Sequence, residues 1–176
     1  MKVEYEVTLD DLVRFNLYHL SHSPFGRRQR SMIRYGPAII FLTLGVIEYL
    51  LLGRSSILIT GWVVALVFFL ATPAWWDWEV KRRTVKFMGE GNNRGITGPC
   101  LLTISQDDLQ VVSDNGGGNL KWSAIEKIVA SGTHTYIYSS SLSAFMIPHK
   151  AFTNDAEREL FVDTARQYLA NQTAST

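Results

Sequence analysis

Four histidines are the residues of this sequence whose types and spacing could bind a metal. His19 and His22 lie three residues apart, which places both on one face of a helix and suits two zinc ligands. A zinc site needs three or four ligands, and the sequence places no further Cys, His or acidic residue with this pair. We therefore expect a structural role for the histidines and no metal site.

Nucleophilic catalysis could involve the serines that precede His149. It would need a hydroxyl, a base and an orienting acid that converge. Nothing in the local sequence requires His149 to meet one of the four candidates, Ser139, Ser140, Ser141 and Ser143. We expect no catalytic residue and no enzymatic activity, although a deep pocket that held His149 or His134 beside an acid would favour catalysis.

The three consecutive glycines at 116–118 could suggest a phosphate-binding loop. Such a loop opens a helix, whereas these glycines lie between two predicted strands. We therefore expect a turn here and no nucleotide cofactor. The single cysteine, Cys100, permits no internal disulfide, which suits a reducing compartment.

Two long apolar segments decide how the rest of the chain is organised. Residues 35–52 include one charged side chain, Glu48, and residues 57–76 include none. As helices, these 18 and 20 residues would be about 27 and 30 Å long, enough to cross a hydrocarbon layer of about 30 Å. The four residues between them cannot cross a bilayer. We expect a transmembrane hairpin with both chain ends on the same side.

Basic side chains lie at the base of this hairpin. Arg54 alone lies at the tip, whereas the residues next to the other ends of the two segments are Arg27, Arg28, Arg30, Arg34, Lys81, Arg82, Arg83 and Lys86. The positive-inside rule therefore predicts that both termini are cytoplasmic. These eight residues are also candidate contacts for anionic lipid, although topology alone explains them equally well. With a formal net charge of +1 and its bases against the bilayer, the chain is not expected to bind nucleic acid.

Glu48 is the one acid within the apolar segments. An intramembrane acid is a functional candidate by default. Here an interfacial position near the outer end, or pairing with Arg54, is the favoured interpretation.

The polar segments predict short strands and helices. Residues 2–7 alternate polar and apolar as a half-buried strand does, and Thr8 with Asp11 marks a helix start. The second apolar helix should continue over 77–89. Six strands are expected at 101–105, 109–113, 120–122, 125–130, 135–139 and 144–147, with a last helix capped by Thr153 or Asn154. Residues 2–7 could supply a seventh strand, and Trp122 and Phe152 are expected in the core.

These elements predict four regions. They are an N-terminal strand and amphipathic helix (1–34) that packs with the C-terminal domain, the transmembrane hairpin (35–76), a cytoplasmic helix extension and linker (77–98), and a C-terminal strand-rich domain (99–176).

The order of these elements resembles the YcxB-like family of small bacterial membrane proteins, whose C-terminal region is PH-like. Two motifs sharpen the resemblance, Leu120-Lys121-Trp122-Ser123-Ala124-Ile125 and Ile147-Pro148-His149-Lys150-Ala151-Phe152. The family often has two basic residues after the proline, where this chain has His149 and Lys150. The resemblance implies an α+β membrane protein of the bacterial cytoplasmic (inner) membrane, with a PH-like antiparallel barrel closed by a C-terminal helix. It transfers no active site.

Two functions are compatible with this organisation. The first is a non-enzymatic, membrane-anchored module at the cytoplasmic face that binds a protein partner or a second copy through a groove or sheet edge. The alternative is an accessory subunit of a membrane transport or envelope assembly that docks through the hairpin. Small residues favour such helix contacts, and the hairpin offers Gly45, Gly61, Ala65 and Ala71.

Overall fold

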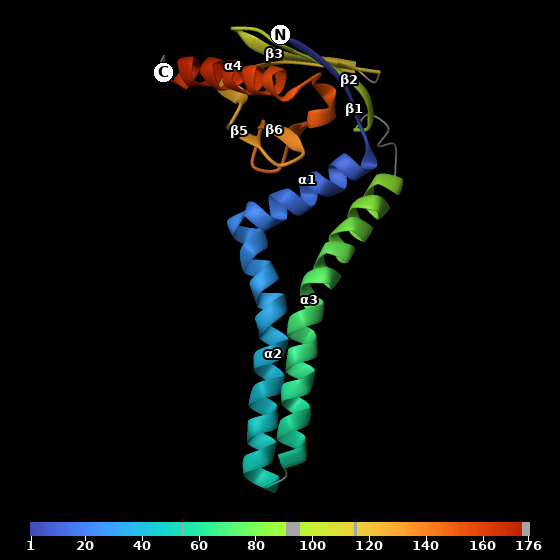
Figure 1. Cartoon of the computed structure of the whole chain (residues 1–176), viewed down its shortest axis with the longest axis vertical. Helices are drawn as coiled ribbons and strands as arrows, with labels where there is room; N and C mark the ends of the chain where they lie inside the picture. The colour runs from blue at the N-terminus through green and yellow to red at the C-terminus, as the bar shows by residue number, and fades with distance from the viewer. Residues whose placement is uncertain (54, 91–95, 115, 174–176) are drawn as a thin grey trace. The chain divides into compact units, whose positions relative to one another are not determined.

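Figure 1 shows the computed structural model, which describes residues 1–53, 55–90, 96–114 and 116–173. Contacts divide the chain into two units, each with its own packing. The sheet unit comprises Met1–Phe15 and Phe87–Thr176, and the hairpin unit comprises Asn16–Lys86. The sheet unit thus contains chain segments from before and after the hairpin.

Two long helices, α2 (Pro24–Leu52) and α3 (Ser55–Gly89), form most of the hairpin unit (Figure 1). The Ser23 hydroxyl accepts a hydrogen bond from the Gly26 N–H at 3.0 Å and caps the start of α2. Gly53 ends α2 in the left-handed conformation, with φ of 65°, which glycine adopts without steric cost. As expected, α3 continues without interruption through residues 77–89.

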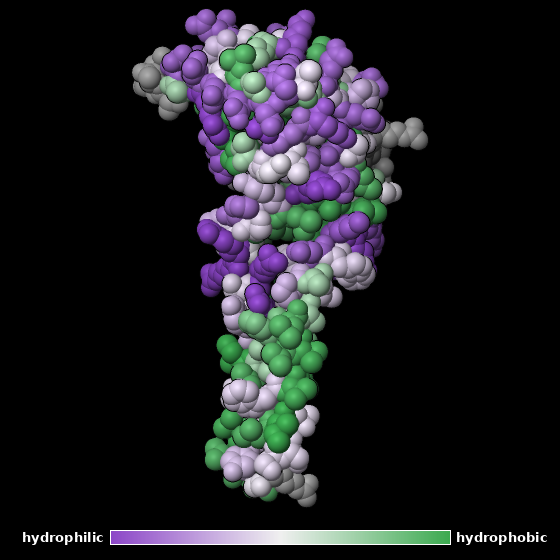
Figure 2. All heavy atoms as spheres, viewed as in Figure 1, coloured by the Kyte–Doolittle hydropathy of each residue, from purple (hydrophilic) through white to green (hydrophobic). Residues whose placement is uncertain are grey.

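Both helices are long and apolar enough to cross a membrane. The candidate spans are Pro24–Leu52 and Leu58–Gly89, which contain the two apolar segments of the sequence. Most of their large apolar side chains are not covered by any other part of the protein. Figure 2 shows apolar residues gathered along the two helices. Side chains of this kind on the outside of a helix pair are expected to face lipid.

The sheet unit contains two antiparallel sheets. In the first, β1 (Lys2–Val7), β2 (Gly98–Ile104), β3 (Asp108–Ser113) and β4 (Gly116–Lys121) follow one another in that order. The second contains β5 (Lys127–Ala130), β6 (His134–Tyr138) and β7 (Ala144–Pro148), also in chain order. The strand expected at residues 2–7 is confirmed, and it pairs with β2 so that Tyr5 lies opposite Cys100.

The expected closed barrel is not observed among the described residues. No strand of one sheet is hydrogen-bonded to a strand of the other in the described parts of the chain. At one seam, Trp122–Ala124 forms a short 3₁₀ helix, η1, which turns the chain away after β4 so that β5 begins a separate sheet. At the other seam β1 and β7 are in contact but are not paired. Strand patterns in a sequence cannot distinguish a closed barrel from two packed sheets, because both have the same alternation and turns.

The prediction of a turn at the three glycines was wrong, because β4 begins at Gly116 and contains all three. Gly117 and Gly118 lie inside β4, opposite Val112 and Val111. Glycine is intrinsically unfavourable in a strand. Here pairing with β3 outweighs the low intrinsic preference of glycine for a strand.

The helices α1 (Leu9–His22) and α4 (Asp155–Thr173) flank the sheets. Asn154 caps α4, because its side-chain oxygen accepts a hydrogen bond from the Glu157 N–H at 2.8 Å. As expected, Trp122 and Phe152 are buried. The Trp122 indole N–H donates to the Ser105 carbonyl oxygen at 2.9 Å, and the Phe152 ring lies 5.4 Å from that of Phe161 in α4. A second short 3₁₀ helix, η2 (His149–Ala151), joins β7 to this region.

Candidate functional site

The eight basic residues expected to contact lipid all lie on α2 and α3 within the hairpin unit. Two of them share one acid on their own helix. The Nε atoms of Arg82 and Arg83 donate to the Glu79 carboxylate at 2.9 and 2.7 Å, and the Glu79 side chain is almost fully covered. Arg82 donates to Glu79 from Nη2 as well, at 3.2 Å. Both guanidinium groups are largely exposed, so their remaining N–H groups can approach a phosphate.

Arg30 and Arg34 connect the two helices instead. The Arg30 guanidinium lies 3.8 Å from the Asp77 carboxylate on α3. Arg34 places its guanidinium 4.0 Å above the Phe69 ring, a cation–π contact between α2 and α3. The proposed lipid contacts therefore include two residues that also hold the hairpin together.

Arg27, Arg28 and Lys81 are the most available of the eight. Each has an exposed side chain that, among the described residues, makes no ion pair or side-chain hydrogen bond. A cationic side chain next to an apolar span can reach a lipid phosphate with little loss of hydration. Of the eight candidate lipid contacts, these three therefore have the most accessible charged groups.

Glu48 lies beside a pocket between the tip halves of α2 and α3. The pocket has a volume of about 400 Å³, and its polar lining residues are Glu48, Ser56 and Thr60. The Thr60 hydroxyl is committed to the Ser56 carbonyl oxygen at 2.9 Å. The expected pairing of Glu48 with Arg54 lies outside the described residues. The exposed Glu48 side chain, one turn from the end of α2, fits an interfacial position.

A buried acid–histidine pair joins the first turn of α1 to β6 in the sheet unit. The Nε2–H of His134 donates to an Asp11 carboxylate oxygen at 2.8 Å, and the two side chains are only 4% and 7% exposed. The Thr8 N–H and hydroxyl donate to the other oxygen at 2.8 and 2.7 Å. Burial alone would raise the pKa of Asp11, but these hydrogen bonds hold it below its usual value.

The sequence predicted only half of this arrangement. Thr8 and Asp11 form the expected helix cap, and the Asp11 N–H returns a bond to the Thr8 hydroxyl at 3.3 Å. The bond to His134 spans 123 residues of sequence, and no local pattern could have indicated it. The Thr133 hydroxyl is hydrogen-bonded to the remaining ring nitrogen of His134 at 2.8 Å. The hydroxyl, the ring and the carboxylate follow one another as in a catalytic triad. Because the Asp11 carboxylate and the His134 ring are both buried, we interpret these hydrogen bonds as a structural tie, that is, a link that holds α1 against β6.

His149 lies in a different pocket, between the β5–β6 turn and α4. The pocket has a volume of about 390 Å³, and Arg158, Glu159, Asp163 and Arg166 supply its charged side chains. The Arg158 guanidinium approaches the Nδ1 atom of His149 at 3.4 Å. Burial and the Arg158 charge lower the pKa of His149. Arg158 is also paired with Asp155 and Glu159, so the pocket carries balanced charge.

The serine candidates do not meet His149. Ser139 and Ser140 form the turn before β7 and are hydrogen-bonded to Ser143, whereas His149 follows the end of β7. Ser143 and His149 flank β7 and are six residue steps apart, which at about 3.3 Å for each step is roughly 20 Å. A Ser–His arrangement from these residues is therefore excluded. Among the described residues, no group of three or more His, Cys, Asp or Glu side chains is placed to hold a metal.

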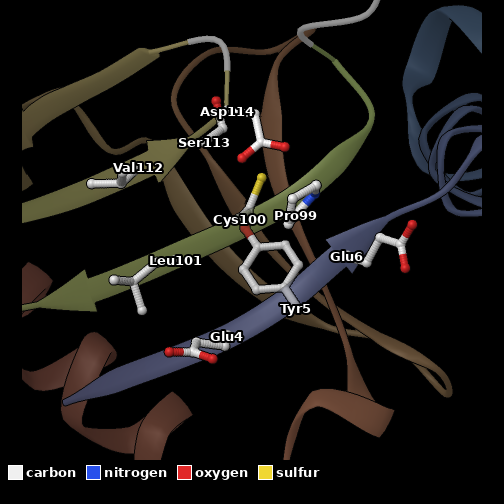
Figure 3. Close-up of a pocket in the computed structure, with 9 residues that line it drawn as sticks. All are labelled: Glu4, Tyr5, Glu6, Pro99, Cys100, Leu101, Val112, Ser113 and Asp114. Carbon is white, nitrogen blue, oxygen red and sulfur yellow. The ribbon is translucent and has the colours of Figure 1, made fainter.

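Cys100 lines a third pocket, at one end of the first sheet, shown in Figure 3. This pocket has a volume of about 480 Å³, and the carboxylates of Glu4, Glu6 and Asp114 lie around it. Burial, and then the Asp114 charge, raise the pKa of the Cys100 thiol. Because the thiolate is the reactive form, a raised pKa disfavours nucleophilic chemistry at this cysteine.

Comparison with protein families identifies part of the sheet unit. A search of curated proteins found no relative that matches the chain. Residues 104–165 match the family described as YcxB-like protein. The match begins at the end of β2, includes both motifs noted in the sequence and ends within α4. The chain therefore carries a YcxB-like family domain at residues 104–165.

Proposed function

We propose that this protein is a non-enzymatic module anchored in the bacterial inner membrane, whose sheet unit binds a protein partner or a second copy at the cytoplasmic face. In this proposal the sheet unit is a PH-like domain in which two sheets and α4 replace a closed barrel. The hairpin is the anchor, and its basic side chains hold it against anionic lipid.

One observation carries the proposal: β1 and β2 pair in one sheet although the whole hairpin lies between them in the sequence. If α2 and α3 cross the membrane, this pairing requires both of their outer ends to be on one side. The positive-inside rule, applied to the basic residues, favours the cytoplasm as that side. A folded unit held at the membrane surface in this way suits recruitment or self-association.

The groups of the sheet unit that could do chemistry support binding over catalysis. Asp11 and His134 are buried against each other, His149 lies beside Arg158, and burial raises the pKa of the Cys100 thiol. Each group thus has a structural explanation in the contacts it makes.

The alternative, docking through the hairpin, has less support. Gly45 and Ala65 are buried, and a Cβ at Gly61 would lie 3.1 Å from the Phe41 carbonyl oxygen. These small residues therefore serve the packing of α2 against α3. Ala71, the fourth small residue of the hairpin, is exposed and could contact a helix of another protein. The substitution Ala71→Leu therefore tests this alternative.

Thiol labelling tests the topology. In a Cys100→Ser background, Leu142→Cys places a thiol on an exposed turn of the sheet unit and Ser56→Cys places one at the hairpin tip. A membrane-impermeant maleimide should label the first in inside-out vesicles and the second in right-side-out vesicles. Labelling of both from the same side would contradict the anchor role.

Native mass spectrometry from native-membrane nanodiscs tests the binding role. We expect an additional polypeptide mass, or twice the 19.9 kDa of the chain. That mass should persist in Ala71→Leu if the sheet unit makes the contact, and its loss in this variant would support docking through the hairpin. A bare monomer throughout would contradict both binding roles.

A further inference from the structure

Arg34 places a positive charge in the contact surface between α2 and α3. The α2 residues of this surface are partly or fully buried and recur every three or four positions: Arg30, Arg34, Ala38, Phe41 and Gly45. The guanidinium carbon of Arg34 lies 4.0 Å from the centre of the Phe69 ring. Phe69 lies about two helical turns inside the end of the apolar segment 57–76. The charge of Arg34 is therefore surrounded by apolar side chains of the membrane-spanning part.

The hairpin unit offers no acid to this arginine. The acids in its sequence are Glu48, Asp77 and Glu79. Asp77 lies beside Arg30, and Glu79 is bonded to two arginines of its own helix. Glu48 is roughly 21 Å from Arg34 along α2, near the other end of the helix. Among the described residues, Arg34 makes no ion pair or side-chain hydrogen bond, and its Nε atom is buried without a partner.

A positive charge in this position requires an anion. Exposed basic residues at the base of the hairpin keep their hydration, whereas Arg34 is half-buried between two apolar helices. The Phe69 ring attracts the charge but supplies no oxygen acceptor for the guanidinium N–H groups. Because Nε is the buried nitrogen, the two Nη groups stay accessible from outside. Two parallel N–H groups of this kind fit two oxygens of a phosphate.

A phospholipid is the source of phosphate that a membrane supplies next to the hairpin. Eight basic residues gather at the base of the hairpin, against the acids Asp77 and Glu79. This excess of positive charge favours a headgroup with net negative charge over one that carries its own ammonium group. The α2 side chains of Met32, Tyr35 and Ile39, close to Arg34 in sequence, are exposed and can contact the acyl chains.

We propose that Arg34 binds the phosphate of one anionic phospholipid, which stays with the hairpin as a bound ligand. The inference rests on the proposed function, because α2 and α3 must lie in the membrane. It divides the eight candidate lipid contacts into two kinds. The exposed basic residues attract the anionic surface in general, whereas Arg34 retains a single lipid because opposite charges interact more strongly where water is excluded.

Native mass spectrometry of the full chain tests the proposal, after release into mild detergent from nanodiscs of phosphatidylethanolamine and phosphatidylglycerol. The unchanged protein should retain one phosphatidylglycerol. In Arg34→Gln the lipid-bound fraction should fall at least tenfold. The matched control is Arg28→Gln, which removes the same charge from an exposed position about 120° around α2. This control should retain the lipid as the unchanged protein does.

A second variant separates the guanidinium from the packing of the hairpin. Phe69→Leu removes the cation–π contact with Arg34 but keeps an apolar side chain between the helices. It should retain the lipid. Loss of the lipid in Phe69→Leu to the same extent as in Arg34→Gln would show that helix packing holds it, and would overturn the assignment to Arg34.

Other results would also overturn the proposal. They are equal loss in Arg34→Gln and Arg28→Gln, equal retention of phosphatidylethanolamine, release of the lipid by millimolar inorganic phosphate, or a polypeptide adduct in place of the lipid that disappears in Arg34→Gln. Thiol labelling at Ser56→Cys, as described above, separates this failure from that of the proposed function. Absence of a retained lipid with the expected labelling would overturn the Arg34 site alone, whereas altered labelling in the unchanged background would overturn the anchor role.

Discussion

Replacing Asp11 by alanine should open the sheet unit at the junction of α1 and β6. The substitution removes the carboxylate that accepts three hydrogen bonds, from the Thr8 N–H, the Thr8 hydroxyl and the His134 ring. Loss of the buried bond to His134 costs about 1.5–3 kcal/mol. Loss of the helix cap costs about 1 kcal/mol more. We expect a total of about 3 kcal/mol, which is roughly a hundredfold in an opening equilibrium.

Hydrogen–deuterium exchange of the full chain in nanodiscs measures this opening. Amides of β1, β2 and β6 should exchange roughly a hundredfold faster in Asp11→Ala than in the unchanged protein, because exchange from these strands requires opening of the sheet unit. Asp10→Ala is the matched control. Asp10 is the neighbouring acid on α1, but its pair with Arg14 is solvent-exposed, so exchange should stay close to that of the unchanged protein. Equal exchange in the two variants would refute the assignment of Asp11 and His134 as a tie.

Three further outcomes are expected. The folded state lowers the pKa of Asp11. The unchanged protein should therefore exceed Asp11→Ala in free energy of unfolding by its full amount above about pH 4, and this difference should be lost as the pH falls further. Urea midpoints measured against pH test this. Trp122→Ala removes a fully buried side chain and its bond to the Ser105 carbonyl oxygen; it should destabilise the sheet unit by about 3–5 kcal/mol, again measured by urea. In vesicles, Arg27→Glu with Arg28→Glu should reduce cosedimentation of the synthetic peptide 24–52 with anionic lipid relative to neutral lipid. Equal dependence on anionic lipid in the altered and unaltered peptides would count against the lipid contacts.

Elements with a local signal could be predicted accurately. The strand at residues 2–7, the Thr8–Asp11 cap, the long α3 and the Asn154 cap of α4 each depend on side-chain spacing within a few residues. Hydrophobic period and capping chemistry act over that range, so the sequence contains the necessary information.

Features that depend on distant partners were missed or wrong. The glycines at 117 and 118 became strand because β3 pairs with them. The division into two sheets followed from the turn at Trp122–Ala124, which a strand pattern does not encode. Within the hairpin unit, the Arg34 guanidinium makes a cation–π contact with the Phe69 ring on the other helix. The sequence around Arg34 indicated only a cluster of basic residues.

The sequence by itself determined that the chain has two apolar helices of membrane length, basic residues at their base and a strand-rich C-terminal part, because these depend on composition and short-range periodicity. Only the tertiary structure decided that β1 joins β2 across the hairpin and that His134 is bonded to Asp11. The physical reason is the same in each case. Strand pairing and buried hydrogen bonds join residues far apart in the chain, and their choice of partner depends on the packing of the whole unit.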